Sequence, residues 1–221
     1  MNAEIHVKAQ KDGEVFKDLE NGPSDLDSGI LLELGSIGAG HAATSLSDVL
    51  QEPISIDVPK IHNIKAHLIP QFYNLHDTPT TAIYLQLAEK FGCDILLMFE
   101  YTEAKKIAAM MTMTSSIEEL DPTLETSALQ ELANILIGSF LTSISDFVGI
   151  GLLPTTPETV TDTFDAIIDN FLIKQSMTQD GNAMIFETRF RRNGEDAKSI
   201  LMIFPTEELK ALLVEKSKLM L

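Results

Sequence analysis

Segments whose apolar residues have the spacing of a helix alternate along this chain with segments whose apolar residues are typical of strands. Helical spacing predicts helices from Ser28 to about residue 50 and at 102–113, about 123–148, 161–171 and 206–220. Shorter runs rich in β-branched residues predict strands at 54–58, 64–69, 81–88, 93–100, 183–191 and 199–205. Mixed elements of this kind, with paired strands and long helices to cover them, indicate an α+β layer architecture.

The first 26 residues differ from the rest of the chain. They are polar and end in KDLENGPSDLD, which combines Asn-Gly-Pro with repeated aspartates. Such a segment has little apolar surface to bury, so residues 1–26 are predicted to form a flexible tail. The remaining residues, 27–221, are enough for a single domain with a core of its own.

Two of the predicted helices contain a repeat. When the chain is shifted by 98 residues, positions 29–50 align without a gap on 127–148, and nine of these 22 positions are identical, among them Glu33 with Glu131. Such identity is far beyond chance for two arbitrary helices. We therefore expect an internal duplication with pseudo-two-fold symmetry. Its repeats span about 28–115 and 123–205, followed by a C-terminal helix at 206–220.

Three glycines in LLELGSIGAGHAATSL, namely Gly35, Gly38 and Gly40, look like a phosphate-binding loop. The second copy retains only Gly138 and is a helix by its length and pattern, so the first copy is predicted to be a helix too. A dinucleotide fingerprint needs G-x-G-x-x-G at a strand-to-helix turn, whereas the order here is G-x-x-G-x-G. We interpret the glycines as places where another backbone packs closely, at a cost of roughly 1 kcal/mol each relative to alanine.

Charge and composition exclude several classes of function. With 16 basic and 33 acidic residues the net charge is −17, which disfavours nucleic-acid and anionic-membrane partners, and the cluster Arg189, Arg191 and Arg192 is interpreted as a solvated face. The longest uncharged run near the middle, 132–145, has 14 residues, fewer than the roughly 20 that a membrane span needs. The single Cys93 forms no internal disulfide, and the N-terminus has no signal-peptide pattern. We expect a soluble cytoplasmic protein.

Two polar residues stand out in the apolar second helix. Glu131 and Asn134 are three residues apart and project from one face, which Ser127 shares one turn earlier. Asparagine is a poor helix former, because its amide competes for backbone hydrogen bonds. Taken alone, this pattern fits either a structural amide bonded to a neighbouring segment or a functional polar site.

The two helices, ALQELANILIGSFLTSISDF and LLELGSIGAGHAATSLSDVL, resemble the signature helices of the CheC family, which includes CheX and the middle domains of FliY and FliM-type switch proteins. The resemblance covers about residues 28–205. It implies a CheC-like duplicated fold in which two long helices pack on an antiparallel β-sheet. It also implies a chemotaxis phosphatase that hydrolyses the aspartyl phosphate of a CheY-like response regulator.

This resemblance assigns roles to the polar residues of the second helix. Asn134 would enter the regulator's active site and hold the attacking water in line, much as a glutamine does in GTPases. Glu131 would pair with a lysine beside the phosphoaspartate and dock the helix, with Ser127 in support. No cofactor is expected in this chain, because the response regulator supplies its own divalent metal ion, expected to be Mg.

The first copy departs from the family pattern. Glu33 is kept, but Ser36 stands in place of asparagine, Gly29 occupies the position of Ser127, and His41 replaces the usual second asparagine. Because serine is shorter by an amide group, we predict one competent site on the second helix and a degenerate first site at Glu33 and Ser36. His41 has no second ligand at helical spacing, so no metal site is expected.

Two other interpretations remain open at this point. Because the motif is half degenerate, the chain can instead be a catalytically weak binding or adaptor protein, for a CheD-type receptor deamidase or for the response regulator. Alternatively, the two helices simply pack as the duplicated core of an acidic domain. Under that interpretation Glu131 and Asn134 point inward.

Overall fold

The computed structural model of the chain describes residues 28–87, 92–174, 181–192 and 194–219. The tail predicted at 1–26 lies outside these residues. In chain order, the elements are α2 (Ser28–Leu50), β1 (Ser55–Lys65), η1 (Ala66–Leu68), α3 (Ile69–Tyr73), β2 (Pro79–Leu87), β3 (Cys93–Glu100), α4 (Tyr101–Thr112), η2 (Ile117–Glu119), α5 (Pro122–Val148), β4 (Glu158–Thr163), α6 (Phe164–Lys174), β5 (Asn182–Arg192), β6 (Glu195–Pro205) and α7 (Glu207–Lys218).

The six strands form one sheet in the order β1-β5-β6-β3-β2-β4, and every neighbouring pair is antiparallel. Exchanging β1 with β4, β2 with β5 and β3 with β6 reverses this order and so leaves the sheet unchanged. The central pair is β3 and β6, with Leu96 opposite Met202. Each half of the chain therefore runs helix, strand, helix, two strands, helix, and α7 is the counterpart of α4. The α+β fold with pseudo-two-fold symmetry predicted from the sequence is confirmed.

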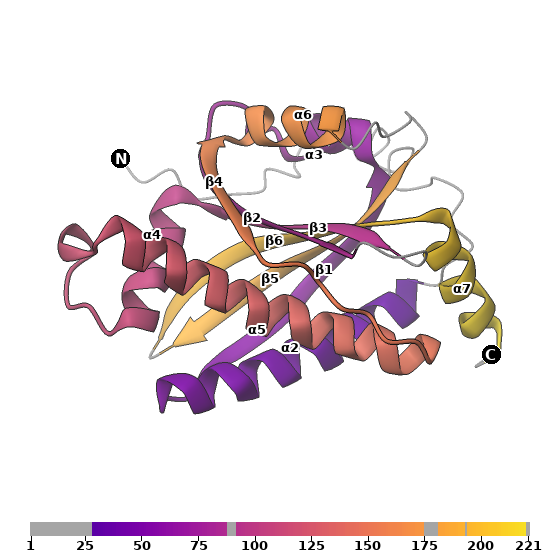
Figure 1. Cartoon of the computed structure of the whole chain (residues 1–221), viewed down its shortest axis with the longest axis horizontal. Helices are drawn as coiled ribbons and strands as arrows, with labels where there is room; N and C mark the ends of the chain where they lie inside the picture. The colour runs from indigo at the N-terminus through magenta and orange to yellow at the C-terminus, as the bar shows by residue number, and fades with distance from the viewer. Residues whose placement is uncertain (1–27, 88–91, 175–180, 193, 220–221) are drawn as a thin grey trace.

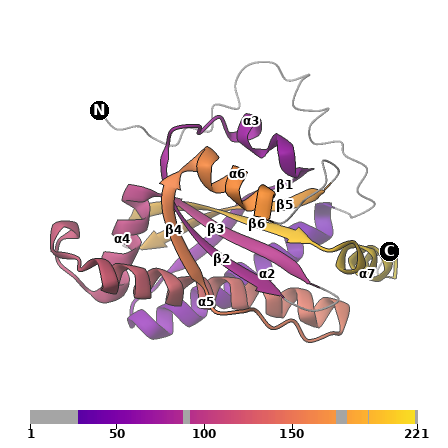
Figure 2. The same cartoon turned by 45° about the horizontal axis from the view of Figure 1, so that its top comes forward.

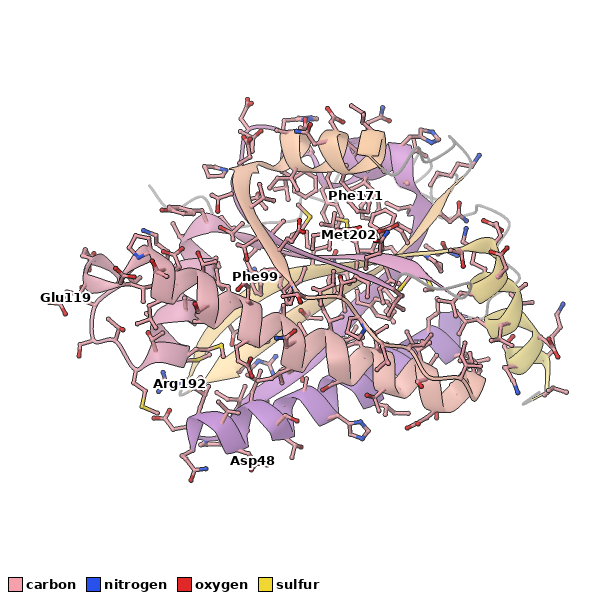
Figure 3. All side chains as sticks on the ribbon, in the orientation of Figure 1. Asp48, Phe99, Glu119, Phe171, Arg192 and Met202 are labelled. Carbon is pink, nitrogen blue, oxygen red and sulfur yellow. The ribbon has the colours of Figure 1, made fainter. Side chains whose placement is uncertain are left out.

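The helices cover both faces of the sheet. Figure 1 shows α2 and α5 side by side along one face, α3 and α6 on the other, and α4 and α7 at opposite ends. Figure 2 shows the same three layers, which are the α2 and α5 pair, the sheet, and the α3 and α6 pair. One core cluster lies between the sheet and α2, α4, α5 and α7, and a second lies between the sheet and α3 and α6. Phe171 of α6 and Met202 of β6 belong to the second cluster, and both are labelled between α6 and the sheet in Figure 3.

The two long helices run antiparallel and pack closely. The Ser143 hydroxyl of α5 donates to the backbone oxygen of Leu34 on α2 at 3.0 Å. A Cβ on Gly38 would lie 2.9 Å from the Cα of Phe140, and a Cβ on Gly35 would lie 3.0 Å from the ring of Phe186. The interpretation that another backbone packs closely against these glycines is confirmed for Gly38, whereas the close neighbour of Gly35 is the side chain of Phe186. The interpretation is wrong for Gly40, since a Cβ there would meet nothing within 4 Å.

The structure corrects two of the predicted elements. The strand predicted at 54–58 continues to Lys65, and the separate strand predicted at 64–69 is wrong, because Ala66 begins a 3₁₀ turn that leads into α3. Pro70 lies in the first turn of α3, and Asn74 closes that helix in the left-handed conformation. The helix predicted at 161–171 begins later, at Phe164, since Glu158–Thr163 pairs with β2 as an edge strand.

Helix α5 is long and apolar enough to cross a membrane by length and composition alone, with a mean hydropathy of 1.2 over its most apolar window. Half of that window is buried inside the protein. Its apolar side chains, such as Leu132 and Leu136, are fully buried in the core cluster shared with the sheet and α2. The core of this fold therefore accounts for the apolar character of α5.

Candidate functional site

The ends of α5 are fixed by local chemistry. Asp121 caps the N-terminus, where its Oδ1 accepts from the backbone N–H groups of Thr123 at 2.9 Å and Leu124 at 3.1 Å, and Pro122 occupies the first turn. The helix ends at Gly149, which has a φ of 76° and donates its N–H to the oxygen of Ser145. The start signals read from Asp121 and Pro122 are confirmed.

Glu131 and Asn134 lie on the outer face of α5. The neighbouring positions Leu132, Ala133 and Leu136 are fully buried, whereas Glu131 and Asn134 are exposed. Residues three apart on a helix have Cβ atoms about 5–6 Å apart, so the carboxylate and the amide share one patch of surface. The interpretation that they point inward as polar members of the core is wrong.

Both side chains are available to a partner. Neither the Glu131 carboxylate nor the Asn134 amide makes a hydrogen bond or ion pair with any residue in the described part of the chain. Ser127 is also exposed, but its hydroxyl donates to the oxygen of Thr123 at 3.0 Å and so is turned toward its own helix. The structure therefore brings Glu131 and Asn134 together and leaves Ser127 tied to the preceding turn.

A neighbouring residue that the sequence analysis did not single out fixes this part of α5. The Gln130 amide donates to the backbone oxygen of Pro157 at 3.1 Å. Pro157 is buried and directly precedes β4, so this bond ties the site-bearing turn of α5 to the edge of the sheet. This role could not be recognised in the sequence, because Gln130 is one glutamine on a helix and its bonding partner lies 27 residues away.

The first copy presents its polar pair in a similar way. Glu33 and Ser36 are exposed on α2, as are Gly29 and His41. Because Gly38 lies opposite Phe140 in the antiparallel pair, Ser36 and Asn134 are separated by about eight residues, or about 12 Å along the helix axes. The two candidate sites therefore lie toward opposite ends of one outer surface.

A glycine and a threonine follow each site on the same surface. Thr142 donates to the oxygen of Gly138 at 2.8 Å, and Thr44 donates to the oxygen of Gly40 at 3.0 Å. A Cβ on either glycine would meet nothing within 4 Å, so packing inside this chain does not require glycine at either position. Gly138 follows Asn134 by one turn, and a glycine there leaves the helix backbone open to a closely approaching partner.

No group of three or more His, Cys, Asp or Glu residues able to hold a metal ion occurs within the ranges that the structure describes. His41 is exposed on the outer surface of α2. The carboxylate of Glu131 and the amide of Asn134 offer three oxygen atoms, fewer than the six or more oxygen ligands that Mg²⁺ or Ca²⁺ takes. The surface is thus suited to hydrogen bonding with a partner's groups.

A sequence model of the CheC-like family matches residues 124–161, a range that includes Glu131 and Asn134. The CheY-P phosphatase CheC of Bacillus subtilis (strain 168) is 27% identical over 190 residues, which cover 84% of this chain and 90% of CheC. The flagellar motor switch phosphatase FliY of the same strain is 30% identical over 165 residues, 69% of this chain. That alignment spans 42% of FliY.

Solved structures share the fold at lower identity. The crystal structure of FliY from Thermotoga maritima superposes with a TM-score of 0.66 at 22% identity, covering 88% of this chain and 96% of the chain in that structure. The FliM middle domain of H. pylori superposes with a TM-score of 0.62 at 11% identity, covering 84% of this chain and 95% of that domain. At these identities the likeness shows the fold and nothing finer.

Proposed function

We propose that this chain, which is similar to the CheC-like family model over residues 124–161 and to CheC over 190 residues, removes the phosphoryl group from the phosphoaspartate of a CheY-like response regulator. The observation that carries the proposal is the exposed pair of Glu131 and Asn134 on α5, within the range matched by the family. A phosphatase named for CheY-P is among the relatives that align over most of both chains. This activity belongs to the cytoplasm, where response regulators act.

In the proposed reaction a positioned water is the nucleophile, so this chain need supply neither a nucleophile nor a general base. The water oxygen forms a bond to phosphorus while the bond between phosphorus and the aspartyl oxygen breaks. The products are inorganic phosphate and the free aspartate, and the water's proton leaves with the phosphate. Asn134 would hold the water in line through its amide, which can both donate and accept a hydrogen bond. The Mg ion required by the acyl phosphate would come from the regulator.

Glu131 would act in docking. Its carboxylate is exposed and has no partner in the described chain, so it can pair with a lysine beside the phosphoaspartate without breaking an existing bond. Because the chain carries a net charge of −17, long-range attraction to an acidic regulator is not expected. Recognition would instead be local, through this contact and through the open backbone at Gly138.

The first site, at Glu33 and Ser36, would bind without catalysing efficiently. The Ser36 hydroxyl is exposed, but it ends closer to the helix axis than an amide would. A water held there would lie farther from a phosphoryl group docked at the same depth. Each chain would therefore have one catalytically competent site, the one at Glu131 and Asn134.

The second candidate function is that of an adaptor for a CheD-type deamidase or for the regulator itself. The observation that favours it is the exposure of the degenerate pair, which offers a docking face without the asparagine. Under this alternative the chain binds its partner irrespective of phosphorylation and does not turn it over.

Phosphate release from a phosphorylated CheY-like regulator distinguishes the two functions. Wild-type protein, Asn134→Ala and Ser36→Ala are compared, the last being the matched control from the other repeat. The phosphatase proposal predicts loss of stimulation in Asn134→Ala and near-normal stimulation in Ser36→Ala. Stimulation that survives Asn134→Ala refutes it, and loss only in Ser36→Ala assigns the activity to α2.

A further inference from the structure

A cavity of about 190 Å³ lies on the far side of the sheet from the Glu131–Asn134 surface. Its lining includes residues of α3, the start of α6, the first residues of β2 and the last residues of β3, together with residues of β1, β5 and β6. A single water needs only about 10–15 Å³ of such space, so this cavity is large enough for a small organic molecule.

The cavity has an apolar part and a cationic part. Leu75, Met98, Phe164 and Ile200 supply the apolar wall. The basic side chains of Lys60, Arg189 and Lys198 line the same space, which gathers three of the 16 basic residues of a strongly acidic chain.

Two carboxylates also line the cavity, but they are engaged with groups of the chain itself. Glu187 lies 3.7 Å from the Lys60 ammonium and 3.2 Å from Nε2 of His62. Glu100 accepts a hydrogen bond from the Thr102 hydroxyl at 3.0 Å. The lining therefore has three basic and two acidic side chains, a formal charge of +1.

Two polar groups at the cavity have unused hydrogen-bonding capacity. Tyr73 is only 6% exposed, and its phenol oxygen has no hydrogen-bond partner in the described part of the chain. The Nε of Arg189 is likewise buried without a hydrogen bond, although it forms a long ion pair of 3.9 Å with Asp196. Burial, with a further contribution from the charge of Glu187, raises the pKa of the Tyr73 phenol, so it remains a hydrogen-bond donor at neutral pH. Buried donors left unpaired are costly and call for a partner.

We propose that this cavity binds a small organic anion, with one acid group held by Arg189 and Tyr73 and a short apolar body against Met98, Phe164 and Ile200. The acid group would accept the hydrogen bonds that Tyr73 and Arg189 have available. Such a ligand would connect the α3 and α6 layer to the sheet strands that also carry the α2 and α5 layer.

Direct titration of the full chain by calorimetry tests this proposal without any regulator, so its outcome is independent of phosphatase activity. The probes are benzoate, hexanoate and phenyl phosphate, with benzamide as the uncharged control. We expect saturable one-to-one binding of at least one anion, at least about tenfold tighter than benzamide. Preference among the three separates a carboxylate ligand from a phosphate ligand.

Variants locate the binding. Arg189→Gln is expected to weaken the bound anion by about tenfold or more, whereas Arg191→Gln, two positions along the same strand and paired with Asp57, leaves affinity within about twofold. Tyr73→Phe is expected to weaken binding while leaving the melting temperature of the free protein unchanged or higher, because it removes an unpaired buried hydroxyl. The proposal is overturned by an absence of saturable binding up to about 10 mM for all three anions, or by equal binding of benzamide. It is also overturned if Arg189→Gln and Tyr73→Phe both leave the affinity unchanged.

Discussion

Gly38 of α2 lies so close to Phe140 of α5 that a Cβ at position 38 would come within 2.9 Å of the Phe140 Cα. The neighbour is backbone in the middle of a buried helix, so it cannot move aside cheaply. This contact sets the distance between the two helices that carry the candidate sites. The contact also explains why the first copy has glycine at position 38, where the aligned residue of the second copy is Leu136: a leucine at position 38 would collide with Phe140.

We predict that Gly38→Ala lowers the free energy of unfolding by about 1–3 kcal/mol, as overpacking of a core does. The matched control is Gly40→Ala, where a Cβ meets nothing and helix propensity predicts a gain of about 1 kcal/mol. Urea unfolding monitored by circular dichroism measures both. Equal effects of the two substitutions would contradict the close contact.

Gly138→Ala separates stability from function. A Cβ at position 138 has open space, so the variant is expected to gain about 1 kcal/mol of stability from helix propensity. If a response regulator approaches the backbone there, the added methyl group hinders docking and raises the KM for the phosphorylated regulator. Steady-state phosphate release gives the KM, and Gly40→Ala on the degenerate site serves as the control with unchanged KM. An unchanged KM in Gly138→Ala would show that the partner does not approach the backbone at this position.

Ser36→Asn restores on α2 the amide that Asn134 provides on α5. Position 36 is exposed next to Glu33, so the substitution introduces no clash with the core. We expect stimulated dephosphorylation to rise, up to about twofold if both sites become equally active. In the Asn134→Ala background the same substitution is expected to recover part of the lost activity. No recovery in that background would mean that α2 lacks more than the amide.

Stability is expected to fall in acid through the contacts of Glu187. Burial would raise the pKa of this carboxyl, but the hydrogen bond from His62 and the charge of Lys60 outweigh burial and lower the pKa below its usual 4.5. A carboxyl with a depressed folded-state pKa contributes stability that is present above its unfolded pKa and is lost as the pH falls through the folded value.

Unfolding midpoints in urea at about pH 6.5 and about pH 3.5 test this linkage. Glu187→Gln is expected to be less stable than wild type at the higher pH and to approach it at the lower pH. A stability difference between the two proteins that is the same at both pH values would contradict the lowered pKa.

The sequence predicted the fold class because the repeat of 29–50 at 127–148 constrains both helices at once. The isolated run 64–69 misled strand prediction, since its isoleucines and leucine suit either a strand or a short helix. The signals for helix were Pro70 and Asn74, which mark the ends of α3. Tertiary contacts, such as the bond from Ala66 N–H to the oxygen of Gly181, decide the conformation there.

The spacing of Glu131 and Asn134 placed them on one face of a helix, and the resemblance to the CheC family identified the pair as a candidate site. Their exposure could not be derived with certainty from spacing, because α5 is apolar on most of its surface. The Gln130 bond to Pro157 and the cavity beside Tyr73 depend on segments far apart in the chain. No local pattern records such contacts.

The central claim is that the Asn134 amide positions the attacking water, while Glu131 docks the partner. Its most direct test is a separation of kcat from KM for a phosphorylated CheY-like regulator in Asn134→Ala and Glu131→Ala. We predict that Asn134→Ala lowers kcat by about 100-fold or more with KM within about twofold of wild type, and that Glu131→Ala mainly raises KM. An Asn134→Ala variant that keeps its kcat, or that changes KM alone, would contradict the account.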